Sequence, residues 1–415
     1  MHTHWKRDAA LFFSSQTLSL LGSSLVQYAI MWHITLETKS GIMMTLSVIC
    51  GFVPTLLLSP FAGVFADRYD RKKIIMLADG MIALVTLALA LVFAAGHDAL
   101  WLLLLAQAVR AVGSALQGPA VGAILPQIVP AESLMKANGI NGTIQSTIML
   151  VSPLVSGALM GLAPLQAIFF VDVATAALAI GVLLFFLRVP PHEKASRRQE
   201  TSYFLDMRLG FRYIRDHRYL VRFFAYLGGF VFLVTPAAFL TPLQVTRSFG
   251  AEVWRLTAIE ILFSSGMMLG GLVMSSWGGF KNRMRTMLLS NLIMAACTIA
   301  LGFIPWFWLY LVAFGVFGVA LPMYNTPAAV MLQEHVESDF LGRVYSVMTM
   351  LQTSLMPLGM LIFGPLADLV KIEWLLLATG AAMLSFALAV GGDKKLIEAG
   401  LPGVAAAPTS SGTTT

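Results

Sequence analysis

One basic residue stands alone inside a long apolar run. Arg110 is the only charged residue between positions 100 and 125, and Gln107, Ser114 and Gln117 share its face at helical spacing. A charge in such surroundings is expensive unless water, a partner or a ligand compensates it. We therefore predict that this face is hydrated or paired. A structural ion pair, or a clamp on backbone carbonyl groups that fixes helix packing, is the alternative reading of Arg110.

Two carboxylic acids lie deep in other apolar runs. Glu260 is about two helical turns from one end of residues 253–277, and Asp172 lies within residues 165–188. A medium of low dielectric favours the neutral form of such a group, which can then exchange protons or bind a cation. The alternative for Glu260 is a structural carboxyl group that is hydrogen-bonded to a neighbouring helix. Asp79, nearer to a cluster of basic residues, is expected to pair with that cluster.

The segments that must position these groups are membrane helices. The chain has 415 residues, a mean hydropathy of +0.80 and only 12% charged residues, so most of it cannot fold around water-soluble cores. Runs of about 20 apolar residues cross a bilayer, and they must be helical because lipid offers no partner for backbone amides. We predict an all-α membrane protein. Its twelve predicted helices span residues 9–35, 41–66, 73–95, 99–125, 137–162, 165–188, 219–246, 253–277, 285–304, 306–331, 341–368 and 371–391.

Basic residues gather in alternate loops of this pattern. If the N-terminus is cytoplasmic, most of the 27 lysine and arginine residues fall on the cytoplasmic side, where such residues accumulate in membrane proteins. We predict that both termini are cytoplasmic and that this is a multi-pass protein of the cell inner membrane or plasma membrane. The net charge of +6 then reflects topology and contact with anionic lipid headgroups, and not nucleic-acid binding.

The chain divides near its middle. Residues 189–218 form the longest polar stretch before the C-terminal tail, and we predict that they are a cytoplasmic linker whose second half is an amphipathic helix. A wholly disordered linker is the alternative. The predicted parts are a six-helix bundle at residues 1–188, the linker at 189–218, a second six-helix bundle at 219–400 and a disordered tail at 401–415.

An internal repeat supports this division. Pro119 and Pro327 both lie near the end of the fourth predicted helix of their half, 208 residues apart, and Pro153 corresponds to Pro357 in the fifth. Parallel six-helix repeats suit alternating access, in which two halves rock around a site near the middle of the membrane.

Uncharged polar side chains are expected to line such a site. Asn141 and Gln145 share one polar face of residues 137–162, where hydrogen bonding between helices is their alternative role. The 23 methionine and 27 phenylalanine residues offer adaptable apolar surface, which suits a bulky amphipathic compound. The predicted cavity residues are Gln27, Gln107, Asn141, Gln145, Tyr324, Asn325 and Gln352.

The sequence lacks the residues that several function classes require. The sequence has no Gly-x-x-x-x-Gly-Lys-Ser/Thr phosphate loop, so direct use of ATP has no visible site. It lacks the clustered histidines and carboxylates of a metalloenzyme, and Cys50 and Cys297 lie in apolar runs, which argues against a disulfide framework or a cysteine metal site. No element resembles a channel filter. We expect no enzymatic activity, no cofactor and no metal.

Charge is concentrated in one short loop, GVFADRYDRKK, at residues 63–73. Gly63 would permit close helix approach, and Asp67, near a predicted helix C-terminus, can pair with Arg71. The alternative is that this loop only sets the topology, as any short basic loop would. The segment resembles the Gly-x-x-x-Asp-Arg-x-x-Arg-Lys/Arg signature between the second and third helices of the major facilitator superfamily.

Across nearly the whole chain, the sequence looks like the Mef-type macrolide efflux branch of that superfamily, whose wider relatives include siderophore exporters. Similar stretches are PAESLMKANG, EILFSSGMMLGGLVMSSWGGF and LQEHVESDFLGRV. The resemblance implies that the charged loop latches the two halves in the outward-facing state, with Glu334, Asp339 or the amides just before Tyr345 as its partner. The gating residues that it implies are Gly63, Asp67, Arg68, Arg71 and Lys72.

Two further family signatures bear on proton exchange. Arg110 and Gly113 are similar to a fourth-helix pattern that is linked to proton transfer, with a spacing one residue shorter than the common form. The fifth-helix antiporter signature is present only as SPLVSG, in which Pro153 and Gly157 match. The predicted proton-coupling residues are Glu260, Asp172 and Arg110.

The resemblance implies a secondary efflux transporter that exports amphipathic antimicrobial drugs of the macrolide type by proton antiport and alternating access, a multidrug or antibiotic-resistance activity. Export of a siderophore or another endogenous metabolite is the alternative, and a transporter-like sensor is a further one. The expected partners are a small-molecule substrate, protons and the lipid bilayer, without nucleic acid. We expect the protein to be a monomer.

Overall fold

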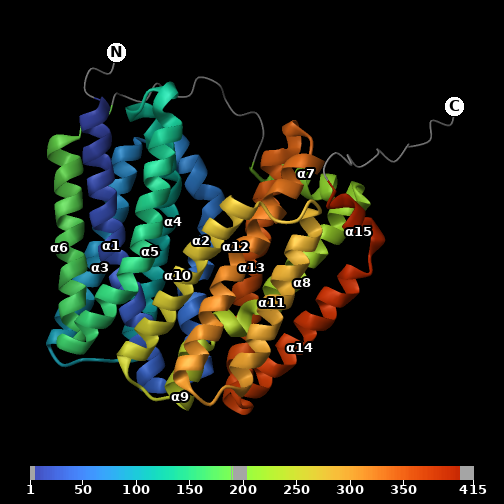
Figure 1. Ribbon diagram of the computed structural model, residues 1–415. Coiled ribbons are helices and arrows are strands. Elements are labelled where there is room, and N and C mark those ends of the chain that lie inside the picture. The colour runs from blue at the N-terminus through green and yellow to red at the C-terminus, as the bar shows by residue number, and fades with distance from the viewer. Residues whose placement is uncertain (1–4, 188, 190–202, 402–415) are drawn as a thin grey trace. The chain divides into compact units, whose positions relative to one another are not determined.

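The computed structural model describes residues 5–187, 189 and 203–401, without the side chains of residues 60, 64, 67, 68 and 203–206. Within these residues all the regular secondary structure is helical (Figure 1). Most of the first half of the predicted linker, and all of the predicted tail except Leu401, lie outside the described residues.

The helices follow one another through short connections. In the first half they are α1 Trp5–Thr38, α2 Gly41–Arg68, α3 Arg71–Ala94, α4 Leu100–Ile128, the 3-10 turn η1 Ala131–Ser133, α5 Leu134–Leu162, α6 Leu165–Gly181 and its π-helical extension η2 Val182–Phe186. In the second half they are α7 Tyr203–Asp216, α8 Arg218–Phe239, α9 Thr241–Ser248, α10 Val253–Trp277, α11 Arg283–Phe303, α12 Phe307–His335, α13 Ser338–Leu369, α14 Ile372–Gly391 and α15 Lys394–Ala399.

Twelve segments of the described chain are long and apolar enough to cross a membrane, which confirms the predicted all-α membrane fold. One prediction needs correction, because the helix expected at residues 219–246 is interrupted at Leu240, between α8 and α9. Pro242 explains the break. Its ring removes a backbone N–H and crowds the carbonyl group four residues earlier, so a continuous helix is disfavoured there.

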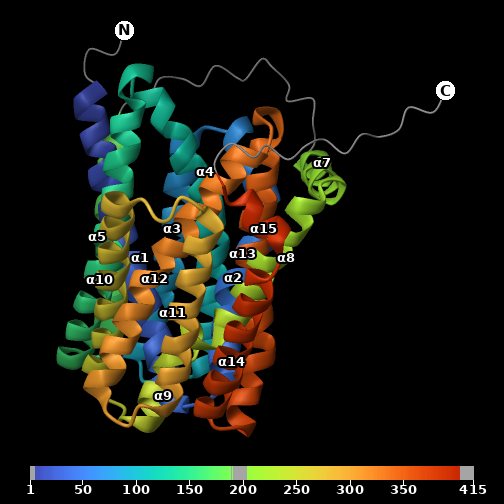
Figure 2. The same ribbon diagram turned by 45° about the vertical axis from the view of Figure 1, so that its right-hand side comes forward.

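Two compact units make up the chain. The first unit holds the residues up to 200 together with 242–261 and 364–368, and the second unit holds the remainder. The predicted boundaries between two bundles stay a prediction. Within the first unit, α1 to α6 lie side by side (Figures 1 and 2), with α1 against α5 and α6 and with α4 against α2 and α3.

Two clusters of buried apolar side chains form the core of these six helices. The first apolar cluster includes Phe12, Ile75 and Ile124, and the second apolar cluster includes Leu89 and Phe169. Along α1, α3, α4 and α6 with its extension η2, the two clusters occupy different stretches of each helix. The residues between these stretches are therefore enclosed by apolar groups on both sides.

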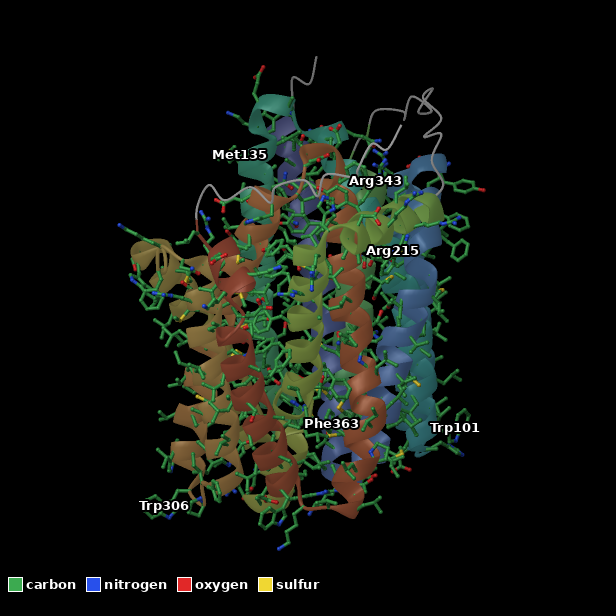
Figure 3. The ribbon with its side chains drawn as sticks, turned by 90° about the vertical axis from the view of Figure 1, so that its right-hand side faces the viewer. Trp101, Met135, Arg215, Trp306, Arg343 and Phe363 are labelled. Atoms are coloured by element: carbon green, nitrogen blue, oxygen red, sulfur yellow. The ribbon has the colours of Figure 1, made fainter. Side chains whose placement is uncertain are left out.

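In the second unit, α11 packs on α12 and α14, and α8 packs on α14 and α7. Helix α7 also contacts α13, since the rings of Tyr213 and Phe340 stack with their centroids 4.5 Å apart. Figure 3 shows Trp306 at one end of this unit and Arg215 and Arg343 at the other. Tryptophan at one interface and basic residues at the opposite one are typical of a membrane-spanning unit.

Candidate functional site

A layer of polar side chains separates the two apolar clusters of the first unit. It is built by α1, α3, α4 and α6, at the positions that lie between the apolar stretches of these helices. We call this set the polar layer. Its members are Ser19, Ser23, Asp79, Thr86, Arg110, Gln117 and Asp172.

An ion pair between Arg110 and Asp172 lies at the centre of the polar layer. Arg110 is 7% exposed and Asp172 is 1% exposed, and Nη1 of the arginine lies 2.5 Å from Oδ2 of the aspartate. The guanidinium also donates to the Thr86 hydroxyl and, over 3.2 Å, to the Ser23 carbonyl group. We predicted both charged residues from the sequence, but we did not predict that they form an ion pair with each other. Their role in proton coupling stays a prediction.

Close packing of α1 on α6 keeps this pair in place. A Cβ atom added at Gly22 would overlap the Thr175 hydroxyl and would lie 2.8 Å from Oδ1 of Asp172. Only glycine therefore lets α1 approach the carboxylate so closely.

We expect Gly22→Ala to lower the free energy of unfolding by about 1–3 kcal/mol, because the added methyl group must displace side chains in a packed interior. Unfolding of the purified protein by SDS in mixed micelles measures the difference. Gly51→Ala in α2 is the control, since no atom of the described residues lies within 4 Å of a Cβ atom at that position. Equal stability of both variants would contradict the close packing.

The second acid of the layer is Asp79, whose placement corrects a prediction. Instead of pairing with the basic loop, its Oδ1 atom accepts hydrogen bonds from Ser19 Oγ and Gln117 Nε2, both at 2.7 Å. Its side chain is 2% exposed. Arg71 and Lys72 of that loop instead donate to backbone carbonyl groups near the helix ends.

These two cations hold the ends of four helices together. Arg71 donates to the carbonyl groups of Ala66 over 3.1 Å and Ala123 over 2.7 Å, and Lys72 Nζ donates to that of Leu187 over 2.9 Å. The accepting groups lie in the last two turns of α2 and α4 and just after η2, where the helix dipole gives partial negative charge. The basic loop thus stabilises the end of the first unit.

The structure describes the other predicted gating residues only in part. The side chains of Asp67 and Arg68 lie outside the described residues. Among the described residues, a Cβ atom at Gly63 would meet nothing within 4 Å, and the gating role of this glycine stays a prediction. Glu334, one of the three possible latch partners, is bound to Arg283 within the second unit.

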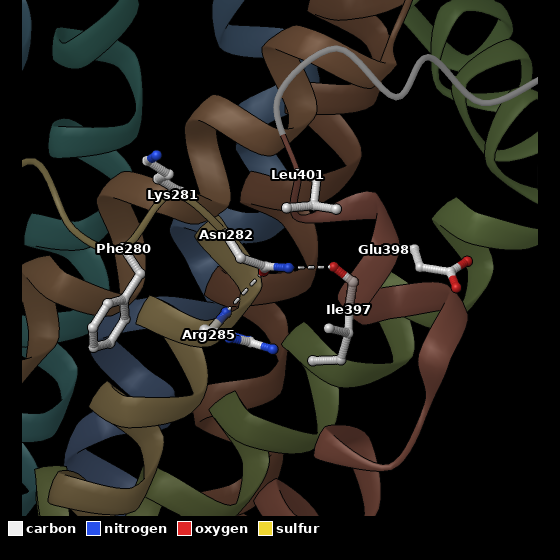
Figure 4. A pocket seen from close by; sticks show the side chains of 7 residues that line it. All are labelled: Phe280, Lys281, Asn282, Arg285, Ile397, Glu398 and Leu401. Carbon is white, nitrogen blue, oxygen red and sulfur yellow. Dashed lines mark hydrogen bonds between the residues drawn. The ribbon is translucent and has the colours of Figure 1, made fainter.

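A side chain in the loop before α11 of the second unit caps its helix, as a side chain of the basic loop caps α3 in the first unit. Asp70 caps α3 by accepting from the Lys72 amide at 3.0 Å, and Asn282 caps α11 by accepting from the Arg285 amide at 3.2 Å. Asn282 also donates to the Ile397 carbonyl group over 2.6 Å, which fixes α15 against α11 (Figure 4). Sequence reasoning did not predict the pocket of about 520 Å³ beside these contacts. Its lining is Phe280, Lys281, Asn282, Arg285, Ile397, Glu398 and Leu401.

Glu260 occupies a different environment from the acids of the polar layer. It is half-buried on α10, in the part of that helix that belongs to the first unit. Tyr28 of α1 interacts with it electrostatically. Among the described residues, the Glu260 carboxyl group has no hydrogen-bond or ion-pair partner. The alternative role, a structural carboxyl group that is hydrogen-bonded to a neighbouring helix, is therefore not seen among these residues.

The predicted cavity residues of the first unit lie at its surface or partly buried. Gln27 and Gln145 are exposed, and Asn141 is half-buried. Gln107 is also half-buried, and its Oε1 atom accepts from Ser47 Oγ at 2.8 Å. On the face of α4 that we predicted to be hydrated or paired, Arg110 and Gln117 turn into the polar layer and Gln107 binds Ser47.

The predicted cavity residues of the second unit are placed less uniformly. Asn325 is exposed and Gln352 is half-buried. Tyr324 differs from the prediction because it is 1% exposed and stacks on Phe230 with the ring centroids 3.9 Å apart. Its ring is enclosed within an aromatic cluster, where stacking with apolar neighbours is favourable.

Sequence reasoning missed a charged cluster around Asp368, at the end of α13. The carboxylate accepts from the backbone amides of Gly41 at 2.7 Å and Ile42 at 2.9 Å. It also accepts from Ser40 Oγ at 2.8 Å and from Arg247 Nη2 at 2.6 Å. All these residues belong to the first unit. Ser40 is a typical residue type for a helix N-cap, so the start of α2 could be recognised in the sequence. No local pattern connects it with an acid 328 residues away.

Twelve membrane-crossing helices and a buried layer of charged side chains are features of polytopic membrane transport proteins. The sequence profile of the Major Facilitator Superfamily matches residues 12–360. The chain therefore belongs to this superfamily of membrane transporters, as a multi-pass protein of the inner or plasma membrane, which confirms the resemblance of its loop signature.

Individual relatives narrow the comparison. The chain is 27% identical over 389 residues to Macrolide efflux protein A of Streptococcus pyogenes, covering 93% of this chain and 96% of the relative. It is 27% identical over 346 residues to Enterobactin exporter EntS of Escherichia coli O127:H6, covering 82% and 79%. The solved structure of nucleoside transporter NupG aligns with a TM-score of 0.69 at 16% identity, over 93% of this chain and 98% of the other. That last likeness is one of fold alone.

Proposed function

We propose that this protein exports amphipathic antimicrobial compounds of the macrolide type across the cytoplasmic membrane in exchange for protons. The observation that carries the proposal is the similarity to Macrolide efflux protein A along 93% of this chain. Because this similarity extends over both halves, it includes all the regions that could contribute to a substrate path.

Glu260 is the group to which we assign proton exchange. Its half-buried carboxyl group has no ion-pair partner among the described residues, so it can gain or lose a proton, or meet a cationic substrate, without first breaking a salt bridge seen there. Asp172 differs, because Arg110 holds it. In this proposal the Arg110–Asp172 pair has a tuning role, and Asp67, Arg68 and Arg71 gate the cytoplasmic side.

A second candidate function is export of a siderophore or another endogenous metabolite. The similarity to an enterobactin exporter over 82% of this chain favours it. Growth in iron-poor medium, together with profiling of secreted metabolites, distinguishes this function from drug export. A strain that lacks the protein would then accumulate the metabolite internally.

The test of the main proposal is efflux of a radiolabelled macrolide from a bacterial strain that lacks its own pumps. We expect the wild type to export the compound and Glu260→Gln to lose most of that export, because glutamine cannot exchange a proton. Glu252→Gln is the matched control. Its carboxyl group lies eight residues earlier, is 54% exposed and pairs with Arg255, so its loss should leave export unchanged.

Addition of a protonophore tests whether export depends on the proton gradient, independently of which compound is exported. Export by the wild type that stops when the protonophore is added supports proton exchange. Export that continues at the same rate contradicts it. Absence of export by a well-expressed wild-type protein contradicts the macrolide assignment and favours the metabolite, while absence of any measurable flux favours a transporter-like sensor.

A further inference from the structure

Asp79 is a buried acid that the proposed exchange at Glu260 does not use. It is 2% exposed and lies in the polar layer, between the two apolar clusters of the first unit. Among the described residues, no cation lies within ion-pair distance of its carboxyl group. An isolated carboxylate in such a place is costly, so the group is expected to be neutral or to bind a cation.

The hydrogen bonds to Asp79 are distributed unequally between its two oxygen atoms. Ser19 Oγ and Gln117 Nε2 both donate to Oδ1, each over 2.7 Å. Oδ2 is buried and has no hydrogen-bond partner in the part of the chain that the structure describes. A neutral acid fits this arrangement better than a carboxylate, because a charged oxygen that is buried without a donor costs more than a neutral hydroxyl in the same place. Oδ1 is then the carbonyl oxygen that accepts both hydrogen bonds.

The charge of the whole polar layer leads to the same conclusion. Among the described side chains of the polar layer, the charged groups beside Asp79 are Arg110 from α4 and Asp172 from α6, and α1 contributes the neutral Ser19 and Ser23. Two ionised acids with one guanidinium would leave a net negative charge between apolar clusters. Asp172 is the ionised acid because Arg110 binds it at 2.5 Å, so a single proton on Asp79 neutralises the layer.

We propose that Asp79 is a proton-binding site of this protein and that it carries its proton in the conformation described here, on Oδ2. A role for this proton in transport rests on the proposed proton exchange. The protonated state itself does not, because it follows from the hydrogen bonds and the charges of the polar layer.

Infrared spectroscopy of the purified full-length protein in lipid nanodiscs tests the protonated state directly. At neutral pH, we expect the wild-type spectrum to contain a protonated carboxyl C=O band that Asp79→Asn lacks. Asparagine has the shape of the neutral acid, so this variant should fold. A difference spectrum that shows loss of ionised carboxylate bands instead would overturn the proposal.

Ser19→Ala gives a second measurement that does not remove the acid. A hydrogen bond to a carbonyl oxygen lowers its stretching frequency, so deletion of the Ser19 donor should shift the Asp79 band to higher frequency without abolishing it. Thr17→Ala is the control, because Thr17 Oγ1 donates only to the Phe13 carbonyl group in its own helix. An unshifted band in Ser19→Ala would contradict the assignment of Oδ1 as the carbonyl oxygen.

Sodium is the competing occupant of the site. Spectra in sodium chloride and in choline chloride should be the same if Asp79 binds a proton. A protonated band that disappears only when sodium is present would overturn the proposal in favour of a monovalent cation site.

Transport assays then address the coupling role. In proteoliposomes, we expect Asp79→Asn to lose uptake of a radiolabelled macrolide driven by a proton gradient, while it keeps exchange of labelled for unlabelled compound. Full gradient-driven uptake in this variant would overturn the coupling role. If the wild type itself shows no gradient-driven uptake, the proposed function fails, and the infrared result still decides whether Asp79 holds a proton.

Discussion

Arg110→Ala is expected to lower the free energy of unfolding by about 3–5 kcal/mol, because it leaves a buried aspartate without its counter-ion. Asp172 is 1% exposed, and its remaining partner in the polar layer is the Ser23 hydroxyl at 3.5 Å. Unfolding by SDS in mixed micelles measures the loss. Because the same cation bridges α1, α3, α4 and α6, we also expect export to fall with the fraction of folded protein.

The double variant Arg110→Ala with Asp172→Asn distinguishes an unpaired charge from a lost contact. Removal of both charges should recover most of the stability that the single variant loses, since no uncompensated group then remains. Arg212→Ala is the control, because its pair with Asp216 spans 3.9 Å at a site where both side chains are more than half exposed. We expect it to cost less than about 1 kcal/mol. Similar losses in the single and double variants would contradict this account.

Asp368→Ala is expected to lower the free energy of unfolding by about 2–4 kcal/mol, since it removes four hydrogen bonds to a carboxylate that is partly shielded from water. Two of the lost donors are the first backbone amides of α2, at Gly41 and Ile42, where the helix dipole also favours an anion. The third and fourth are Ser40 Oγ and Arg247 Nη2.

Hydrogen exchange locates the effect of that substitution. Peptides that contain Gly41 and Ile42 should exchange faster in Asp368→Ala than in the wild type, because their amides lose their acceptor. Asp98→Ala is the control, as Asp98 is an exposed acid between α3 and α4. Unchanged exchange at Gly41 and Ile42 would show that the carboxylate does not hold the start of α2.

The amino-acid sequence determined the class of this protein. Apolar runs of bilayer length can satisfy their backbone amides only as helices, so the twelve helices could be placed to within a few residues at most of their ends. The same reasoning identified Arg110, Asp172 and Glu260, because an ionisable group inside an apolar run is visible without any knowledge of packing. The loop signature at Gly63–Lys72 identified the superfamily.

Only the tertiary structure decided which of these groups meet. Arg110 and Asp172 pair across 62 residues of chain, and Asp368 binds the start of α2 from 327 residues away, so neither contact leaves a local pattern in the sequence. Asp79 was assigned to the wrong partner because proximity along α3 favoured the basic loop. Rotation of the helix instead turns its carboxyl group towards α1 and α4. Helical periodicity fixes which residues share a face, and the packing of helices fixes what that face meets.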